Sequence, residues 1–273
     1  MKRLSLILFT SLLLFSCKNN KVSSTFRNDI TIDAKLDDWE KFIYIKDINS
    51  GFAVANNDSF LYIVLKTNDQ KIVRKILMNG LTVWLKRKGL KSAKYGIKYP
   101  LGMAQSRKGY DQEGFTPPHG FNRKRNKPKF DINKMIKITK KQQTGIEICG
   151  PEKDDFIILG FDNKDGIRVS IGTYEDQFVY ELRYPIYNNT DYSSYSLNIK
   201  PRGVINLTLE SRAQLPEFHK GIRGGFNHPG AGFPNRRGGV PISTPPGRKI
   251  PGADNSMYRD LNLKLKIKLA ESE

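Results

Sequence analysis

The sequence predicts an all-β protein: an antiparallel β-sandwich of the immunoglobulin-like or jelly-roll type, with two long basic loop insertions. Three observations support this fold class. Leu261–Leu269 alternates strictly between Leu or Ile and Asn or Lys, as in a strand with one buried and one solvated face. Phe60–Thr67 is almost entirely apolar, which indicates a strand covered on both faces. Many short strand-like runs follow one another with turn residues between them.

The sandwich is expected to open at Ile30, which begins a short strand ending in a turn. Asp33, Asp37 and Asp38 are residues that bond their own backbone in turns and helix caps. Leu36 and Trp39 then return to the core, and a second strand follows from Phe42. A tryptophan just after a turn predicts a buried plug beneath the edge of the sheet.

Two helices and a hairpin are predicted next. Asp69–Leu77 is either a helical or an extended crossover, and we favour a short helix. Asp131–Lys141 has apolar residues at the spacing of a basic amphipathic helix. Gly80–Lys86 and Lys94–Tyr99 indicate a hairpin. Further strands are expected at Thr144–Ile148, Asp155–Phe161, Ile167–Tyr174, Gln177–Pro185, Tyr195–Lys200 and Val204–Glu210. The acidic turn at 162–166 is either a plain turn or a structural calcium site.

The N-terminus predicts export and lipidation. Lys2 and Arg3 precede an apolar run that is too short to span a bilayer, as in a signal peptide. The run ends Leu14-Phe15-Ser16-Cys17, which resembles the lipobox of bacterial lipoproteins. That resemblance implies lipidation of Cys17 by palmitate-type acyl chains. The expected organisation is a signal peptide over 1–16, a tether over 17–26 and one domain over 27–273, placed on the periplasmic side of a bacterial cell envelope. The alternative is an ordinary signal peptide with an incidental cysteine.

Positive charge is concentrated in the two loops, 101–130 and 212–257. Residues 101–130 hold seven Lys or Arg against two acids, and residues 212–252 hold seven against one. Such basic loops favour an anionic partner. Envelope glycans, lipid headgroups and an acidic envelope protein are the candidates, and export makes nucleic acid an unexpected partner. Solvated decoration without a partner is the alternative.

Four stretches resemble family 9 carbohydrate-binding modules. These are Ile30–Trp39, with its turn followed by Asp-Trp, then 57–63, 80–85 and Tyr180–Ile186. The likeness extends loosely to DOMON domains. The resemblance implies a sandwich that binds sugar without catalysis. In some DOMON relatives a His and a Met hold haem, and Met103 or Met257 would be the methionine here.

Strand alternation predicts a ligand-binding face. If the apolar residues of each strand face the core, the opposite set contains Trp84, Lys86, Arg168, Glu181 and Arg183. A flat aromatic ring beside paired charges suits a sugar, because the ring stacks on C–H groups while the charges bond hydroxyls. The alternative is that Trp84 packs under the 101–130 loop and the charges form an ordinary solvated face.

No arrangement of residues predicts catalysis. His119, His219 and His228 all lie in Gly- and Pro-rich stretches, without metal-ligand spacing on a regular element. Cys149 is expected to be a small buried residue. The sequence therefore predicts a lipid-anchored envelope binding module for carbohydrate or another anionic or polar ligand, and not an enzyme. The alternative is a structural or assembly lipoprotein that docks an acidic partner through its basic loops.

Overall fold

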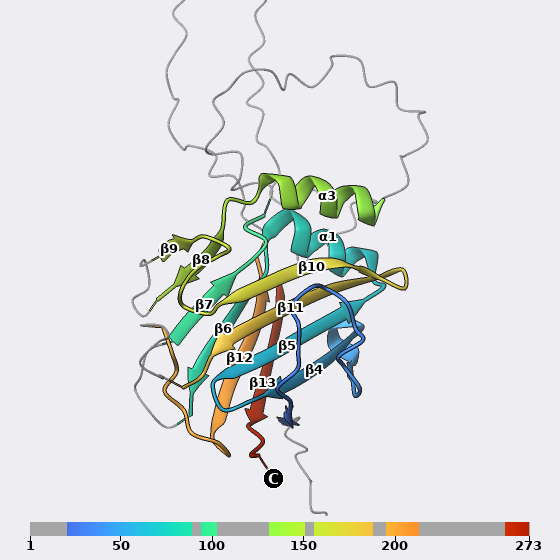
Figure 1. The fold of residues 1–273 in the computed structure, drawn as a ribbon. Coiled ribbons are helices and arrows are strands. Elements are labelled where there is room, and N and C mark those ends of the chain that lie inside the picture. Colours follow the sequence, from blue (N-terminus) through green and yellow to red (C-terminus); the bar gives the residue numbers. More distant parts are fainter. Residues whose placement is uncertain are drawn as a thin grey trace, which may run out of the picture.

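The structure is a computed structural model, and it describes residues 21–88, 94–102, 131–150, 156–187, 195–212 and 260–272. It confirms the all-β sandwich. One sheet has seven strands in the order β1-β13-β12-β6-β7-β8-β9. The other has six, in the order β10-β11-β5-β4-β2, with β3 paired to β4. Two helices, α1 and α3, lie together over one end of the sandwich (Figure 1).

The strands of the seven-stranded sheet are β1 (Lys21–Ser23), β6 (Thr82–Arg87), β7 (Lys94–Lys98), β8 (Ile146–Cys149), β9 (Phe156–Leu159), β12 (Val204–Ser211) and β13 (Leu261–Lys268). Those of the six-stranded sheet are β2 (Thr25–Phe26), β3 (Ile43–Ile45), β4 (Ser50–Asn56), β5 (Phe60–Thr67), β10 (Arg168–Tyr174) and β11 (Gln177–Pro185). All pairs are antiparallel except two, in which β1 runs parallel to β13 and β2 parallel to β4.

The main core lies between the sheets and is built by strand alternation. In β13 every second residue is buried, from Leu261 to Ile267, while the Asn and Lys residues between them are exposed. β6 buries Val83 and Leu85 in the same way, so Thr82, Trp84 and Lys86 share the outer face. The expected hairpin of β6 and β7 is confirmed by their antiparallel register.

A second apolar cluster lies on the outer face of the six-stranded sheet. The loop 27–42 crosses this face and packs Ile30, Ala34 and Trp39 against Tyr62 and Val64. β5 is therefore covered on both faces, as its apolar sequence predicts. The expected burial of Trp39 is confirmed, but beneath this loop and not between the sheets. The strand expected at Ile30 is wrong, because the backbone there turns to bond a side chain of β11.

The segment expected to be a tether enters both sheets. β1 and β2 occupy 21–26, so the expected tether is wrong for these residues, and residues 17–20 lie outside the described part of the chain. Ser24 lies at the crossing point, where its hydroxyl donates to Asn56 Oδ1 and accepts from the backbone N–H of Ala270 (2.8 Å). These bonds join the N-terminal segment to β4 and to the end of β13, and the crossing explains why a polar, aperiodic stretch becomes ordered.

Both predicted helices are present. α1 (Gln70–Asn79) begins at Asp69, whose carboxylate accepts from the N–H groups of Lys71 and Ile72 and so caps the helix. α3 (Ile132–Gln142) is capped in the same manner by Asp131. The strand expected over 195–200 is wrong, since that segment forms a turn and extended coil. Its hydrogen bonds to the rest of the chain include those from Ile199 N to Ile186 O (2.8 Å) and from Arg87 Nη1 to Asn198 O (3.0 Å). The predicted loop segments 103–130 and 213–257 lie outside the described residues.

Candidate binding site

The five residues predicted to form a ligand face lie on two different sheets. Trp84 and Lys86 belong to β6 of the seven-stranded sheet, whereas Arg168 belongs to β10 and Glu181 and Arg183 to β11 of the other sheet. The outer faces of the two sheets point in opposite directions. Alternation predicted correctly that each residue opposes the core, but it could not show that the residues lie on opposite sides of the sandwich.

Glu181 is fully buried, so its expected place on a solvated face is wrong. The loop 27–42 covers it, and its carboxylate accepts three hydrogen bonds from that loop. Trp39 Nε1 donates to Oε1 (2.7 Å), and the N–H groups of Asp33 and Ala34 donate to Oε2 (3.0 and 2.6 Å). Burial raises the pKa of Glu181 to about 7, although these three donors act to lower it. Glu181 therefore fixes the loop to the sheet.

Arg168 and Arg183 hold the turn that connects β9 to β10. Arg168 Nη1 donates to the carbonyl oxygens of Asn163 and Ile167 (both 3.0 Å), and Arg183 Nε donates to that of Gly166 (3.0 Å). The guanidinium of Arg183 also lies over the Phe60 ring, 4.7 Å from its centroid. This turn was the candidate calcium site, and two guanidinium groups donate hydrogen bonds to its carbonyl oxygens. Among the described residues, no three His, Cys, Asp or Glu side chains are placed to share a metal ion.

Trp84 is half-buried on the outer face of the seven-stranded sheet. Its ring lies flat against Gly96, where a Cβ would come within 2.7 Å of it, and Lys94 Nζ lies 4.0 Å from the ring centroid on the outer face. Trp84 Nε1 donates to Glu210 Oε2 (2.9 Å). The indole is already occupied by a cation and a carboxylate of its own chain, so it is not a bare stacking platform.

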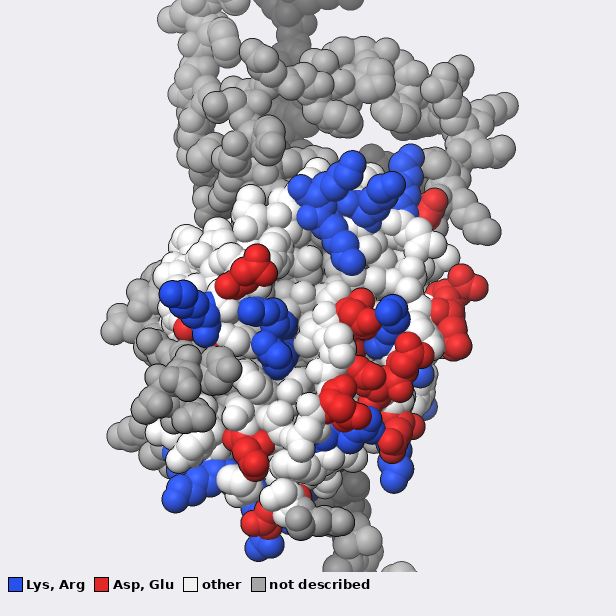
Figure 2. Space-filling view, viewed as in Figure 1, with Lys and Arg blue, Asp and Glu red and all other residues white. Residues whose placement is uncertain are grey.

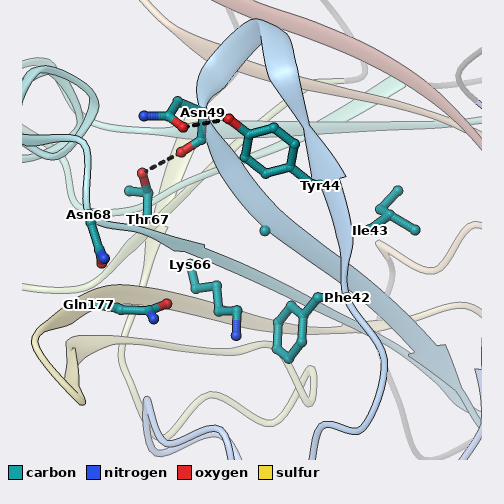
Figure 3. A pocket seen from close by; sticks show the side chains of 9 residues that line it. Phe42, Ile43, Tyr44, Asn49, Lys66, Thr67, Asn68 and Gln177 are labelled. Carbon is teal, nitrogen blue, oxygen red and sulfur yellow. Dashed lines mark hydrogen bonds between the residues drawn. The ribbon is translucent and has the colours of Figure 1, made fainter.

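A different site is hollowed into the outer face of the six-stranded sheet, beside the loop 27–42. It is an open groove of about 310 Å³, shown in Figure 3. That volume is at the lower end of the range for small-molecule sites. The groove is lined by two aromatic residues, one aliphatic residue, one lysine and a set of small polar residues. These residues are Phe42, Ile43, Tyr44, Asn49, Gly51, Lys66, Thr67, Asn68 and Gln177.

Gly51 allows the floor of the groove to form. It pairs with Tyr44 on one side and with Lys66 on the other, so the three residues lie in one row across β3, β4 and β5. A Cβ on Gly51 would come within 2.9 Å of the Lys66 side chain. Without it, Lys66 lies across the sheet and places its amine 3.9 Å from the centroid of the Phe42 ring. This cation–π contact orients both side chains.

The Tyr44 ring is exposed yet held in place. Its side chain is 67% exposed, and its hydroxyl donates to Asn49 Oδ1 (2.6 Å). Asn49 sits in a left-handed turn, with φ of 45°, and its carbonyl accepts from the Thr67 hydroxyl (3.0 Å). Figure 3 shows this chain of bonds along the rim of the groove. Pre-ordering an aromatic ring reduces the entropy lost when a ligand stacks on it.

The groove combines flat apolar surface with neutral hydrogen-bonding groups. Asn68, Asn49 and Gln177 carry side-chain amides, each with donor and acceptor capacity. Lys66 is the one charged residue among the described residues that line it. The sequence predictions missed this site. Alternation across 43–45 does place Tyr44 opposite Ile45, but nothing local shows that Gln177 and Lys66 come to lie beside it.

In the described part of the chain, no group of side chains is arranged as a catalytic site. The thiol of Cys149 is half-buried and lies 3.5 Å from Glu147 Oε1. Burial, together with the neighbouring Glu147, raises its pKa to about 12, so the thiolate needed for nucleophilic attack does not form at neutral pH. His119, His219, His228, Met103 and Met257 lie outside the described residues, as does Cys17. In the described part of the chain, no helix has the length and apolar character to span a bilayer.

No protein-family model matches the sequence, and no curated protein matches it. The structure is similar to two solved structures of a family 9 carbohydrate-binding module from Caldicellulosiruptor kristjanssonii. The one in complex with glucose has 8% identity and a TM-score of 0.39, covering 93% of this chain and 97% of that chain. The one in complex with cellotriose has 11% identity and a TM-score of 0.38, covering 93% and 95%. A likeness at this level carries no argument about the ligand of this chain.

Proposed function

We propose that the protein is a carbohydrate-binding module whose site is the groove at Tyr44. One observation carries the proposal: an exposed, pre-oriented aromatic ring stands beside a second ring and three side-chain amides in one open groove. Aromatic rings stack on the C–H faces of a sugar ring, and amides satisfy hydroxyl groups in both directions. An open groove on a rigid sheet also admits a segment of a longer glycan.

Replacing Tyr44 by Ala should weaken glycan binding by about 1 kcal/mol or more, which is roughly fivefold, because the stacking surface is removed. The melting temperature should hardly change, since the ring is exposed. A glycan array followed by calorimetry on the best ligand measures the effect. Tyr44→Phe is the matched control, because it keeps the ring and loses only the bond to Asn49. Unchanged affinity in Tyr44→Ala would rule out this groove as the site.

Lipid anchoring is the second part of the proposal. The lipobox-like Leu14-Phe15-Ser16-Cys17 supports a lipoprotein held on the periplasmic side of a bacterial envelope. Cys17→Ser should release the protein from the membrane fraction or block its processing, which fractionation and mass spectrometry detect. A Cys17→Ser chain that is processed and fractionates as the wild type does would contradict the anchor. The alternative of docking through loops 101–130 and 212–257 concerns residues that, apart from 101, 102 and 212, the structure does not describe.

A further inference from the structure

The outer face of the seven-stranded sheet gathers lysines that are distant in the sequence. Strand register places Lys21, Lys266, Asn206, Lys86 and Lys94 in one row across five neighbouring strands. Lys264 and Lys268 lie two residues to either side of Lys266 on β13. Adjacent strands are about 4.8 Å apart, so neighbouring amines of this row stand close together. We call Lys21, Lys86, Lys94, Lys264, Lys266 and Lys268 the basic face.

No carboxylate among the described residues forms an ion pair with a lysine of the basic face. Strands β12 and β8 each place one carboxylate on this side of the sheet, those of Glu210 and Glu147. Glu210 accepts from Trp84 and Arg212, and Glu147 lies 3.8 Å from Lys98. Glu210 pairs with Thr82, four residues along β6 from Lys86. The backbone positions of the two acids are thus about 13 Å along the strands from the lysine row. The Glu210 carboxylate reaches Trp84, whose ring Lys94 covers, but it forms no ion pair with Lys94. Burial lowers the pKa of Lys94, and Arg212, Lys264 and Lys86 lower it further, while Glu210 raises it. An anion would relieve this repulsion.

The proposed lipid attachment site is close to the basic face. Cys17 precedes Lys21 by four residues, which span at most about 14 Å when fully extended. β1 begins at Lys21 and forms the edge of the seven-stranded sheet beside Lys266 and Lys268. A chain anchored at Cys17 therefore cannot move this edge far from the bilayer. The span from Cys17 to Lys21, at most about 14 Å, is of the same order as the Debye length, which is about 8 Å at physiological ionic strength.

On the opposite side of the sandwich the loop 27–42 is acidic. Figure 2 shows carboxylates gathered over the loop 27–42, in front of the six-stranded sheet. Asp29, Asp33, Asp37 and Glu40 are exposed there. A negatively charged surface would attract the basic face and repel this one, so the distribution of charge selects one orientation.

The groove at Tyr44 would remain accessible in that orientation. It lies on the six-stranded sheet, at the Gly51 end of β4, whereas the N-terminal segment pairs with Ala55 and Asn56 at the other end. Five residues of strand separate the two positions, which is about 17 Å. The groove would face away from the bilayer.

We propose that the basic face docks on the anionic headgroups of the membrane to which Cys17 is attached, and so presents the groove outward. The inference rests on the proposed lipid anchor for its biological setting, but the surface binding is a property of the sheet alone. A basic surface adds electrostatic attraction to the hydrophobic anchoring by the acyl chains. The basic face and the lipid would act together.

The test uses the chain from residue 18 to 273, which lacks the lipid but contains every residue that the structure describes. Co-sedimentation with vesicles of phosphatidylcholine containing phosphatidylglycerol should show binding that falls as salt is raised. Vesicles of phosphatidylcholine alone should not bind. Substituting Lys264, Lys266 and Lys268 together by Gln should weaken binding at least tenfold. The matched control changes Lys134, Lys137 and Lys140 of α3 to Gln, removes the same charge, and should bind as the wild type does.

Thermal unfolding of both variants checks that they are folded. Equal loss in the two variants, or undiminished binding of the β13 variant, would overturn the proposal, since either result assigns vesicle binding to general charge or to the loops. Binding to a soluble polyanion such as heparin without binding to vesicles would also overturn it, and would assign the face to a polymer. Because no chain in this test is lipidated, the outcome is independent of that for Cys17→Ser.

Discussion

Replacing Trp39 by Ala should lower the free energy of unfolding by about 3–5 kcal/mol, the cost of removing a large buried aromatic side chain. Trp39 is 9% exposed and joins the loop 27–42 to β4 and β5. Its indole also supplies one of the three hydrogen bonds to the buried Glu181. Chemical denaturation, followed by circular dichroism, measures the loss.

Trp39→Phe is the control for the hydrogen bond, because it keeps most of the apolar volume and loses only the indole N–H. Its stability should lie between that of the wild type and that of Trp39→Ala. Near wild-type stability of Trp39→Ala would mean that the loop does not depend on this side chain, and the second apolar cluster would then be wrongly assigned.

Raising the pH from 5 to 8 should weaken the fold through Glu181. Burial raises its pKa in the folded protein to about 7, from an ordinary value of 4.5. The folded state thus binds the proton more tightly than the unfolded state does. The stability contributed by this group is fully present below about pH 4.5 and is lost as the pH rises through 7. The shift corresponds to about 3 kcal/mol.

Denaturation curves of the wild type and Glu181→Gln at several pH values isolate this effect. The amide does not titrate, so the decline in stability between pH 5 and 8 should be smaller in the variant by about that amount. Identical pH profiles would show that Glu181 remains ionised throughout, held as a carboxylate by the N–H groups of Asp33, Ala34 and Trp39.

Strand alternation predicted most of the sandwich. The bounds of β13 and β11 were predicted nearly to the residue. In each strand, side chains point alternately to the core and away from it, so the sequence shows which residues face the core. The segment at 21–26 could not be recognised. It has too few apolar residues to show a period, and it becomes ordered by pairing with β13 and β4, which are distant in the sequence.

Local sequence patterns could not show which strands and loops come together to form the site. Alternation placed Glu181 on the face opposite the core, and this is correct, but the loop residues that bond it come 142 to 148 residues earlier in the chain. The groove at Tyr44 depends in the same way on the meeting of β3, β5 and the first residue of β11. Its residue types are ordinary, and only their juxtaposition makes a site.

The location of the bound sugar tests the central claim most directly. Two-dimensional NMR of the isotope-labelled protein, titrated with the best ligand from a glycan array, reports which backbone amides change. Carbohydrate binding in the groove predicts that the largest changes cluster at Tyr44, Asn49, Gly51, Asn68 and Gln177. Changes centred on Trp84 and Lys86, with the groove unaffected, would contradict it and place the sugar on the opposite sheet.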